Sequence, residues 1–382
     1  MRIIRGMVYM EKMCFEPGEV AIEGERIERV ERCEAGALTE KEAQTYILPG
    51  LVDIHFHGCA GYDFCDGTTE ALRAIASYEM THGTTTICPA TMTLSEEQLL
   101  GICAVAADAV ETEVLEEDVP LKDVLRGIYL EGPFISEEKK GAQNPAYIRT
   151  PDRRMLERLQ QAAKGMICMV AIAPETEGAM DCIRECRGDF RFSIAHTCAD
   201  YETAKAAMEA GAHHVTHLYN AMPPFTHRKP GVIGAAAENE ETRAELICDG
   251  IHIHPCVVKS TFKLFGAGRM ILISDSMMAT GMEDGEYALG GQPVIVKGNR
   301  ALLKDGTIAG SATSLFGCMR TAIQMGVPKE EAVRAATRNP AEAVGLEEEC
   351  GMLLAGRRAD ILIADGEFVL LEVIKSGRAV KA

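Results

Sequence analysis

The sequence predicts an α/β fold, a (β/α)₈ TIM-type barrel accompanied by a small β-sandwich domain built from the N- and C-terminal segments. Two observations indicate the barrel: short apolar runs rich in β-branched residues recur through the middle of the chain, and helical stretches separate them. A third observation indicates the small domain, because residues 1–50 and 347–382 contain strand-like alternation of apolar and polar residues.

The two terminal segments are expected to pair with each other. EVAIEGERIERVE near the N-terminus and ADILIADGEFVLLEVIKSGRAVKA at the C-terminus both read as short strands with turns, and they flank a long middle of different character. We therefore predict a discontinuous small domain of residues 1–50 and 347–382, and a barrel domain of residues 51–346.

Eight runs are candidates for the barrel strands. Between them, Ser95 and Gln98 fit a capping box that opens a helix, and Gly211 ends another. An open doubly wound sheet usually has fewer strands and often a glycine-rich phosphate turn, and neither GxGxxG nor GxxxxGK[ST] occurs here. The runs are LVDIHFH (51–57), TTTICPA (84–90), GIYLEGP (127–133), MICMVAIAPE (166–175), FRFSIAH (190–196), HHVTHLYN (213–220), ELICDG (245–250) and MILISDS (270–276).

Composition excludes several classes of protein. The formal net charge of −18 argues against nucleic acid or an anionic membrane as a partner. No apolar run approaches the ~20 residues needed to span a bilayer, and the N-terminus does not resemble a signal peptide. The 14 cysteines are scattered without a CxxC pair, which favours reduced thiols and a cytoplasmic location.

Polar residues gather where the predicted strands end, and in a barrel of this kind functional groups lie at that rim. His55 and His57 are two residues apart, so on a strand they would face the same side. A single such histidine is more often a hydrogen-bonded core residue, but several on one rim favour a metal site. The rim residues are His55, His57, Glu131, His196, His217, Asp249, His252 and Asp275.

The expected ion is a divalent metal, because imidazole and carboxylate suit Zn, Fe, Mn or Co, and no cysteine lies at these rim positions. An ion with an open position activates water near neutral pH. Asp275, at the end of the last strand, is placed to accept that water's proton and return it to a leaving group. A helix cap or an orienting residue is the alternative role for Asp275.

Five motifs together resemble the N-acetylglucosamine-6-phosphate deacetylases of the amidohydrolase superfamily. They are VDIHFHG, LEGPF, the single histidine after the fifth run, HLYNAM and ISDSMMATG. Further matching segments, such as KGAQNP, RKPGVIGAAAEN, CDGIHIHP and GTIAGSA, extend the resemblance over nearly the whole chain. HxH alone is shared by many amidohydrolases, whereas LEGPF, HLYNAM and DGIHxHP in that order are specific.

The resemblance implies the barrel and terminal β domain described above, with a metal held by Glu131, His196 and His217. His55 and His57 would complete a second metal position, which leaves one or two ions open. Asp275 matches the acid/base of the family. The implied reaction is hydrolysis of N-acetyl-D-glucosamine 6-phosphate to D-glucosamine 6-phosphate and acetate, in cell-wall recycling or in the use of external amino sugars.

The resemblance also implies the substrate contacts. The arginine of the phosphate site comes from the neighbouring subunit in the family, which implies a homodimer in which Arg228 reaches the adjacent site. A solvated surface charge is the alternative for Arg228. The implied substrate-binding residues are Ala142, Gln143, Asn220, Ala221, Arg228, Asp249, His252, Ile308, Ala309 and Gly310.

One departure from the family pattern concerns specificity. Many members have histidine where this chain has Gln143, and an amide can donate a hydrogen bond but cannot become cationic. N-acetylgalactosamine 6-phosphate is therefore an alternative substrate. A different amidohydrolase amidase is a competing function, although the fourth run lacks the lysine that many of those enzymes use. An inactive scaffold is a third interpretation, although every expected ligand is present.

Overall fold

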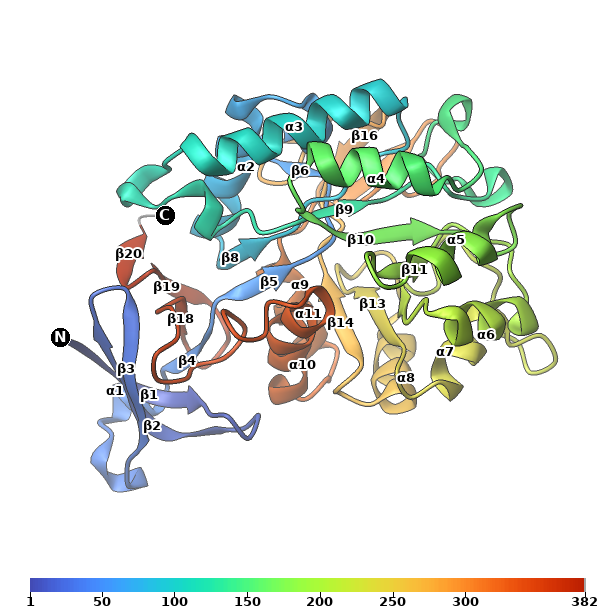
Figure 1. Cartoon of the computed structure of the whole chain (residues 1–382). Coiled ribbons are helices and arrows are strands. Elements are labelled where there is room, and N and C mark those ends of the chain that lie inside the picture. Colours follow the sequence, from blue (N-terminus) through green and yellow to red (C-terminus); the bar gives the residue numbers. More distant parts are fainter. Residues whose placement is uncertain (381–382) are drawn as a thin grey trace.

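The computed structural model describes residues 1–380 and has an α/β barrel at its centre (Figure 1). Each of the eight predicted runs contains a strand of this barrel, so the α/β barrel of the predicted fold is confirmed. The strands are shorter than the runs, because several runs continue into the loops that carry the polar residues. They are β5 (Leu51–Asp53), β8 (Thr84–Ile87), β9 (Ile128–Leu130), β10 (Ile167–Ile172), β11 (Phe192–Ile194), β12 (His214–Val215), β13 (Arg243–Ile247) and β14 (Met270–Ile273).

The barrel closes through one large sheet and one strand pair. Strands β9 to β14 lie in consecutive order, and each neighbouring pair is parallel. Strand β5 pairs in parallel with β8, and the parallel bridge from Ala90 to Tyr129 links that pair to β9. On the other side, Asp275 N donates to His55 O at 3.0 Å. The carboxyl ends of all eight strands therefore meet at one rim.

Helices cover the outside of the barrel (Figure 1). Ser95 and Gln98 form the predicted capping box of α3, and Gly211, at φ 128°, ends α6 as predicted. Helix α1 (Glu40–Ala43) instead lies beside β1 (Arg2–Tyr9). The helices around the barrel are α2 (Thr69–Thr81), α3 (Glu96–Thr112), α4 (Arg153–Ala162), α5 (Ala179–Cys186), α6 (Tyr201–Ala210), α7 (Gly231–Glu238), α8 (Pro255–Phe265), α9 (Leu315–Gln324), α10 (Lys329–Ala336) and α11 (Arg338–Val344).

The two chain ends pair in one seven-stranded sheet with the order β20-β19-β18-β4-β1-β2-β3. Strand β4 lies between β1, its parallel partner, and β18, its antiparallel partner. The pairing of the two ends is thus confirmed, whereas the sandwich form and the boundaries at residues 50 and 347 stay predictions. The strands are β1 (Arg2–Tyr9), β2 (Phe15–Glu23), β3 (Arg26–Arg32), β4 (Tyr46–Pro49), β18 (Ile361–Ala364), β19 (Leu370–Lys375) and β20 (Arg378–Val380).

Two short antiparallel units were not predicted. The strands β6 (Gly58–Cys59) and β7 (Tyr62–Asp63) form a hairpin directly after the histidine pair. A three-stranded sheet of β15 (Gly285–Leu289), β16 (Gln292–Lys297) and β17 (Arg300–Leu303) is inserted between β14 and α9. Strand β16 alternates between exposed and less exposed positions, as expected for a strand with one face toward water.

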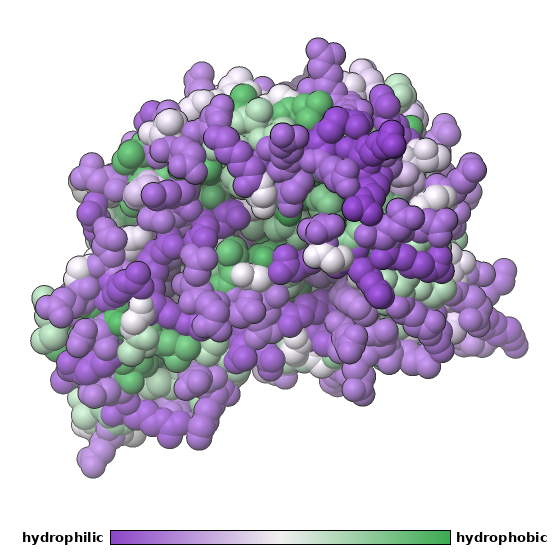
Figure 2. All heavy atoms as spheres, in the orientation of Figure 1, coloured by the Kyte–Doolittle hydropathy of each residue, from purple (hydrophilic) through white to green (hydrophobic). Residues whose placement is uncertain are grey.

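Hydrophilic residues cover most of the face seen in Figure 2, with apolar residues scattered between them. Over residues 1–380, no helix combines the length and the apolar character required to cross a membrane.

One buried lysine joins the small sheet to the barrel. Lys375, at the end of β19, is 0% exposed and forms an ion pair with Asp360 at 2.6 Å. Its Nζ atom also donates to Thr85 O and Asp123 O, each at 2.8 Å. A buried ammonium group is costly unless it is hydrogen-bonded, and these acceptors fix the end of β19 against barrel strand β8 and the turn at Asp123.

Replacing Lys375 with methionine is expected to lower the free energy of unfolding by about 3–5 kcal/mol. The change leaves Asp360 buried without its charged partner, and breaking one side of a buried pair has a cost of this size. Urea denaturation followed by circular dichroism measures it. Adding Asp360→Asn to the methionine variant should restore part of the loss, and a loss below about 1 kcal/mol for the single variant would contradict this account.

Candidate active site

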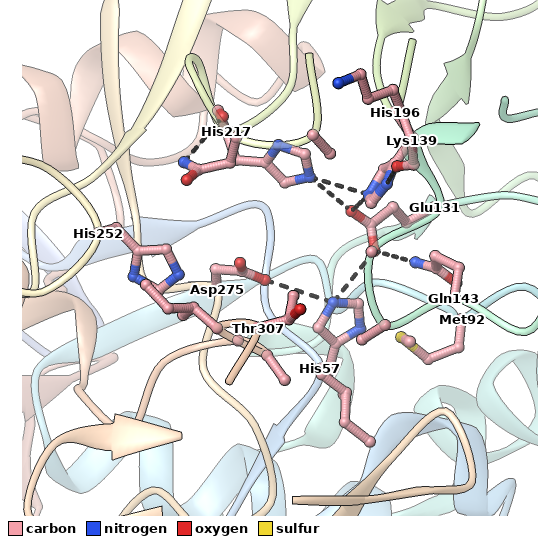
Figure 3. Close-up of a pocket in the computed structure, with 18 of the residues that line it drawn as sticks. His57, Met92, Glu131, Lys139, Gln143, His196, His217, His252, Asp275 and Thr307 are labelled. Atoms are coloured by element: carbon pink, nitrogen blue, oxygen red, sulfur yellow. Dashed lines mark hydrogen bonds and ion pairs between the residues drawn. The ribbon is translucent and has the colours of Figure 1, made fainter. Parts of the chain in front are cut away.

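Five ionisable side chains meet at the rim where the barrel strands end, and each of them is buried. Two follow β5, and the other three follow β9, β11 and β12. Figure 3 shows the imidazole rings of His57, His196 and His217 turned toward the carboxylate of Glu131. The structure thus brings together all five residues predicted as metal ligands, which are His55, His57, Glu131, His196 and His217.

The backbone turns sharply at three residues of this rim. His196 has φ 43°, His217 has φ 28° and Asp275 has φ 48°, all in the left-handed region that residues other than glycine rarely adopt. Each lies two residues beyond the end of its strand. The change of direction aims the side chain across the mouth of the barrel, and strain of this kind is concentrated at functional sites.

Glu131 lies at the centre of the cluster. Its Oε1 atom is 3.0 Å from both His196 Nε2 and His217 Nε2, and these two nitrogens are 3.1 Å apart. Oε1 is also 3.3 Å from His55 Nε2, and Oε2 is 3.2 Å from His57 Nε2. Two groups of three candidate ligands therefore share this one carboxylate: His196 and His217 belong to the first, and His55 and His57 to the second.

These residues fit a divalent cation. Ligand atoms around a tetrahedral zinc ion are about 3.4 Å apart, close to the separations found around Oε1. His55 Nε2 is buried and makes no hydrogen bond to any described residue, as expected of an atom directed at an ion. Burial lowers the pKa of His57, but hydrogen bonds to Asp275 and Glu131 raise it to about 10. The carboxylates of Glu131 and Asp275 therefore favour positive charge at this position, whether it is a proton or a metal cation.

Asp275 lies at the edge of the cluster, beside His57 (Figure 3). Its Oδ1 atom is 3.4 Å from His57 Nε2 and 4.0 Å from His55 Nε2. Burial opposes ionisation, but the hydrogen bond with His57 and the neighbouring positive charge keep the pKa of Asp275 below its usual value. Ser314, rather than Asp275, caps the next helix, so the helix-cap alternative is wrong. The ionised carboxylate is suited to accept a proton.

The loop of residues 136–143 is tied to two of the candidate ligands. Gln143 Nε2 donates to Glu131 Oε2 at 2.7 Å, and Thr93 N donates to Gln143 Oε1 at 2.6 Å. The backbone oxygen of Lys139 is 2.8 Å from His196 Nδ1. Gln143 thus has only one amide hydrogen left for a ligand in the cavity. The roles of Thr93 and Lys139 were missed, because backbone contacts leave no signal in residue type.

A cavity of about 350 Å³ opens above the cluster. It is large enough for a small ligand and has polar atoms of the cluster and of Asp275 at its base. Leu289 and Thr307 extend its wall from the inserted sheet and the loop after it, a contribution that the sequence did not predict. The predicted substrate-binding residues that line it are Ala142, Gln143, Asn220, Ala221, His252, Ile308, Ala309 and Gly310.

Asp249 does not line the cavity but holds a residue that does. Its Oδ2 atom accepts a hydrogen bond from His252 Nδ1 at 2.7 Å, and its Oδ1 atom accepts from the backbone N of Ile251 and of His252 at 2.9 Å. Burial lowers the pKa of His252, but the bond to Asp249 raises it above the usual value. Asp249 therefore orients His252 and favours its cationic form.

Arg228 lies away from its own cavity. It is exposed in the loop between β12 and α7, where its guanidinium is 2.7 Å from His227 Nε2. Phe225 in the same loop is 49% exposed. The prediction that Arg228 serves the site of a neighbouring subunit stays a prediction.

Sequence reasoning missed a carboxylate in the barrel interior. Glu245 on β13 is fully buried between His55 and His214, with Oε2 2.8 Å from His55 Nδ1 and Oε1 2.8 Å from His214 Nε2. Burial opposes ionisation, but the two histidines lower the pKa of Glu245 to about 2. His214 begins its strand, so its position in the sequence places it at the end of the barrel remote from the site. It is nevertheless linked to the candidate ligand His55, because both histidines bond to Glu245.

Comparisons of the sequence with known proteins all match members of one family of hydrolases. A sequence model described as the amidohydrolase family matches residues 46–380. N-acetylglucosamine-6-phosphate deacetylase from Bacillus subtilis (strain 168) is 38% identical over 337 residues, covering 88% of this chain and 84% of the relative. N-acetylgalactosamine-6-phosphate deacetylase from Escherichia coli O157:H7 is 33% identical over 331 residues, covering 86% of each chain.

Solved structures agree with this result. A mutant of N-acetyl-D-glucosamine-6-phosphate deacetylase from Mycobacterium smegmatis, in complex with N-acetyl-D-glucosamine-6-phosphate, has a TM-score of 0.91 and 32% identity. That comparison covers 100% of this chain and 99% of the other.

Proposed function

This chain belongs to the amidohydrolase family and, within it, to the N-acetylglucosamine-6-phosphate deacetylases, and we propose that it hydrolyses N-acetyl-D-glucosamine 6-phosphate to D-glucosamine 6-phosphate and acetate. One observation carries this proposal: Asp275 and the imidazole–carboxylate cluster face each other at the base of a cavity lined by Asn220, Ala221 and His252. A proton acceptor, metal ligands and phosphate-binding groups are thus within reach of one small ligand.

In this proposal Glu131, His196 and His217 hold a divalent ion, and His55 and His57 with Glu131 offer a position for a second. Zn, Fe, Mn and Co all suit these ligands. When bound, the ion supplies Lewis acidity toward water and toward the acetamide carbonyl. The sharing of Glu131 between the two ligand groups supports a site for one or two ions.

The proton transfers are assigned to Asp275. As water adds to the acetyl carbon, the carboxylate accepts a proton from it, which its lowered pKa permits. Asp275 then delivers this proton to the sugar nitrogen as the carbon–nitrogen bond breaks. The amine leaves with the sugar phosphate, and Asp275 returns to its ionised form. The acetyl group leaves as acetic acid, which gives up the second proton of the water to become acetate.

The phosphate group is assigned to the wall formed by residues 217–221 and His252. His217, Tyr219 and Ala221 all have positive φ, at 28°, 80° and 51°, separated by residues of ordinary backbone conformation. The N–H groups of His217, Leu218 and Asn220 are bonded within the protein, so the backbone N–H groups of Tyr219 and Ala221 are the ones assigned to the phosphate. His252, whose pKa is raised by its bond to Asp249, adds a donor that is charged when the ring is protonated.

A second candidate substrate is the galacto epimer. The relative from Escherichia coli O157:H7 acts, by its name, on N-acetylgalactosamine 6-phosphate. Gln143 lines the cavity with one amide hydrogen uncommitted, so it can donate to a sugar hydroxyl but cannot supply a charge.

The experiment that tests the proposal is acetate release by the purified protein with its metal content measured. N-acetyl-D-glucosamine 6-phosphate, its galactosamine epimer and unphosphorylated N-acetyl-D-glucosamine are compared. Fast acetate release from N-acetyl-D-glucosamine 6-phosphate, with slow release from the unphosphorylated sugar, supports the proposal. A preference for the epimer moves the substrate to the second candidate, and metal-loaded protein that releases no acetate from any of them overturns the proposal.

A homodimer, a cytoplasmic location and a role in amino-sugar use or cell-wall recycling complete the proposal. The exposed loop with Phe225 and Arg228 supports the dimer, because its arginine does not line the cavity of its own chain. The 14 free cysteines support a reducing compartment.

Replacing Arg228 with alanine is expected to raise KM for the phosphorylated sugar about 10- to 100-fold, because a hydrogen bond to a charged group contributes about 1.5–3 kcal/mol. If the arginine acts across a dimer, coexpressing Arg228→Ala and Asp275→Asn chains with different tags restores activity in the mixed dimer. The site that keeps Asp275 then receives Arg228 from the other chain.

The matched control is coexpression of Arg228→Ala chains with chains that carry both substitutions, which can donate no arginine. Mixed dimers of the first pair that are no more active than those of the control pair would contradict an arginine shared between subunits.

A further inference from the structure

The carboxylate of Glu245 contacts two of the candidate metal ligands from the interior side of the barrel. Its Oε2 atom is 2.8 Å from His55 Nδ1 and accepts a hydrogen bond from His217 N at 3.2 Å. Its Oε1 atom is 2.8 Å from His214 Nε2. Glu245 and His55 are both 0% exposed, and neither lines the cavity that would receive a substrate.

This arrangement determines which nitrogen of His55 carries its hydrogen. A carboxylate only accepts, so Nδ1 of His55 has to donate to Glu245. In neutral imidazole the other nitrogen then presents a lone pair, and Nε2 is the atom that faces Glu131 at 3.3 Å. His55 Nε2 is also one of the buried atoms without a hydrogen-bond partner among the described residues.

The surroundings of His55 leave its ring little freedom. The ring of Tyr129 packs against it with centroids 4.5 Å apart. The Tyr129 hydroxyl is fixed in turn by Thr216 Oγ1 at 2.7 Å, and Thr216 lies 2.6 Å from Ser193 Oγ. His57, by contrast, has a buried Nδ1 atom without a hydrogen-bond partner among residues 1–380. Of these two histidines, only His55 is held by a charged group behind it.

We propose that Glu245, held in place by His214, is a positioning residue that commits His55 to bind a metal ion through Nε2. Groups behind a metal-binding histidine orient its ring and raise its basicity, and their loss commonly lowers metal affinity by about 10- to 100-fold. The proposal rests on the metal site of the proposed function and deepens it, because it explains what keeps the His55 and His57 position ready for an ion.

The test is titration of the metal-depleted protein with Co²⁺, followed by the visible absorption of the bound ion. Glu245→Gln keeps the shape of the side chain, but its NH₂ group must face either His55 or His214. We expect the affinity of the protein for its most weakly bound Co²⁺ to fall about 10- to 100-fold, and the absorption spectrum of that bound ion to change. In steady-state assays kcat should fall while KM stays unchanged, because Glu245 does not line the cavity.

Glu79→Gln is the matched control. Glu79 on α2 is also a fully buried carboxylate, and it lies beside Asp53 and Thr84 rather than against a candidate ligand. Its substitution should leave Co²⁺ affinity and spectrum as in the unsubstituted protein. His214→Gln is the second variant in case Glu245→Gln does not fold, because it keeps Glu245 and removes one of the two imidazole rings bonded to it. It should weaken Co²⁺ binding in the same direction.

A double-mutant comparison decides whether Glu245 acts through His55. In a His55→Gln background, Glu245→Gln should cause no further loss of Co²⁺ affinity. The proposal is overturned if the loss is the same in both backgrounds, or if Glu245→Gln lowers thermal stability alone and binds Co²⁺ normally. Failure of the unsubstituted protein to bind Co²⁺ at all would instead overturn the metal site of the proposed function.

Discussion

Replacing Asp275 with asparagine is expected to lower kcat for acetate release by about 10³-fold or more, because the variant can neither accept nor return a proton. Asparagine has nearly the same shape, so metal content should be preserved and KM should change little. Stopped assays of acetate release over long incubation measure the residual rate, and metal analysis of the same sample verifies the ions.

A suitable control is Asp152→Asn. Asp152 caps α4 on the outside of the barrel, where its side chain accepts from Arg154 N, and asparagine caps a helix as well as aspartate does. Its activity should equal that of the unsubstituted protein. Retention of activity within about tenfold by Asp275→Asn would contradict the role of Asp275, since acid–base catalysis contributes at least about 10²-fold.

Replacing Glu131 with glutamine is the second change with a large expected effect. Both carboxylate oxygens of Glu131 face hydrogen-bonding or ligand groups. In the glutamine variant an NH₂ group replaces one of these oxygens, and it must point at an imidazole nitrogen or at Gln143 Nε2. We expect loss of all tightly bound metal and a fall in kcat of at least about 10³-fold, more than loss of an outer partner causes. Metal analysis after gel filtration and assays at saturating substrate measure the two effects.

Two control experiments show whether the loss of metal and activity is specific to Glu131. Glu137→Gln, in the exposed loop beside the cavity, should keep its metal and its activity. The unsubstituted protein should lose activity on chelation and recover it when Zn²⁺, Mn²⁺, Fe²⁺ or Co²⁺ is added. A Glu131→Gln variant that keeps stoichiometric metal would show that the carboxylate does not hold the ion.

The barrel and the position of its polar rim could be predicted because both follow from local pattern. Apolar runs such as 270–276 identify strands directly, and parallel strands joined by helices bring their carboxyl ends to one rim. His55, Glu131 and Asp275 could therefore be assigned to one site without any knowledge of distances. The inserted sheet of β15, β16 and β17 was missed because it lies outside the strand–helix alternation.

The contacts behind the ligands could not be predicted, because they depend on three-dimensional packing. Glu245 occupies a strand position, and only the register of β13 against β12 places it beside His214. The 2.7 Å contact from Gln143 to Glu131 depends on the path of a loop, as does the one from the Lys139 carbonyl to His196. The positive φ of His217 is likewise imposed by the fold rather than by residue type.

The strand order of the small sheet has a consequence for synthesis of the chain. Strand β4 ends at Pro49, but its antiparallel partner β18 begins only at Ile361. At translation rates of about 5–20 residues per second, the ribosome needs roughly 15–60 s to make the residues between them. During that interval the nascent chain carries the unpaired edge of an apolar strand, a known site of misassociation. Chains that stall within the barrel, or lose their last segment, keep that edge open and become targets for chaperones and proteases.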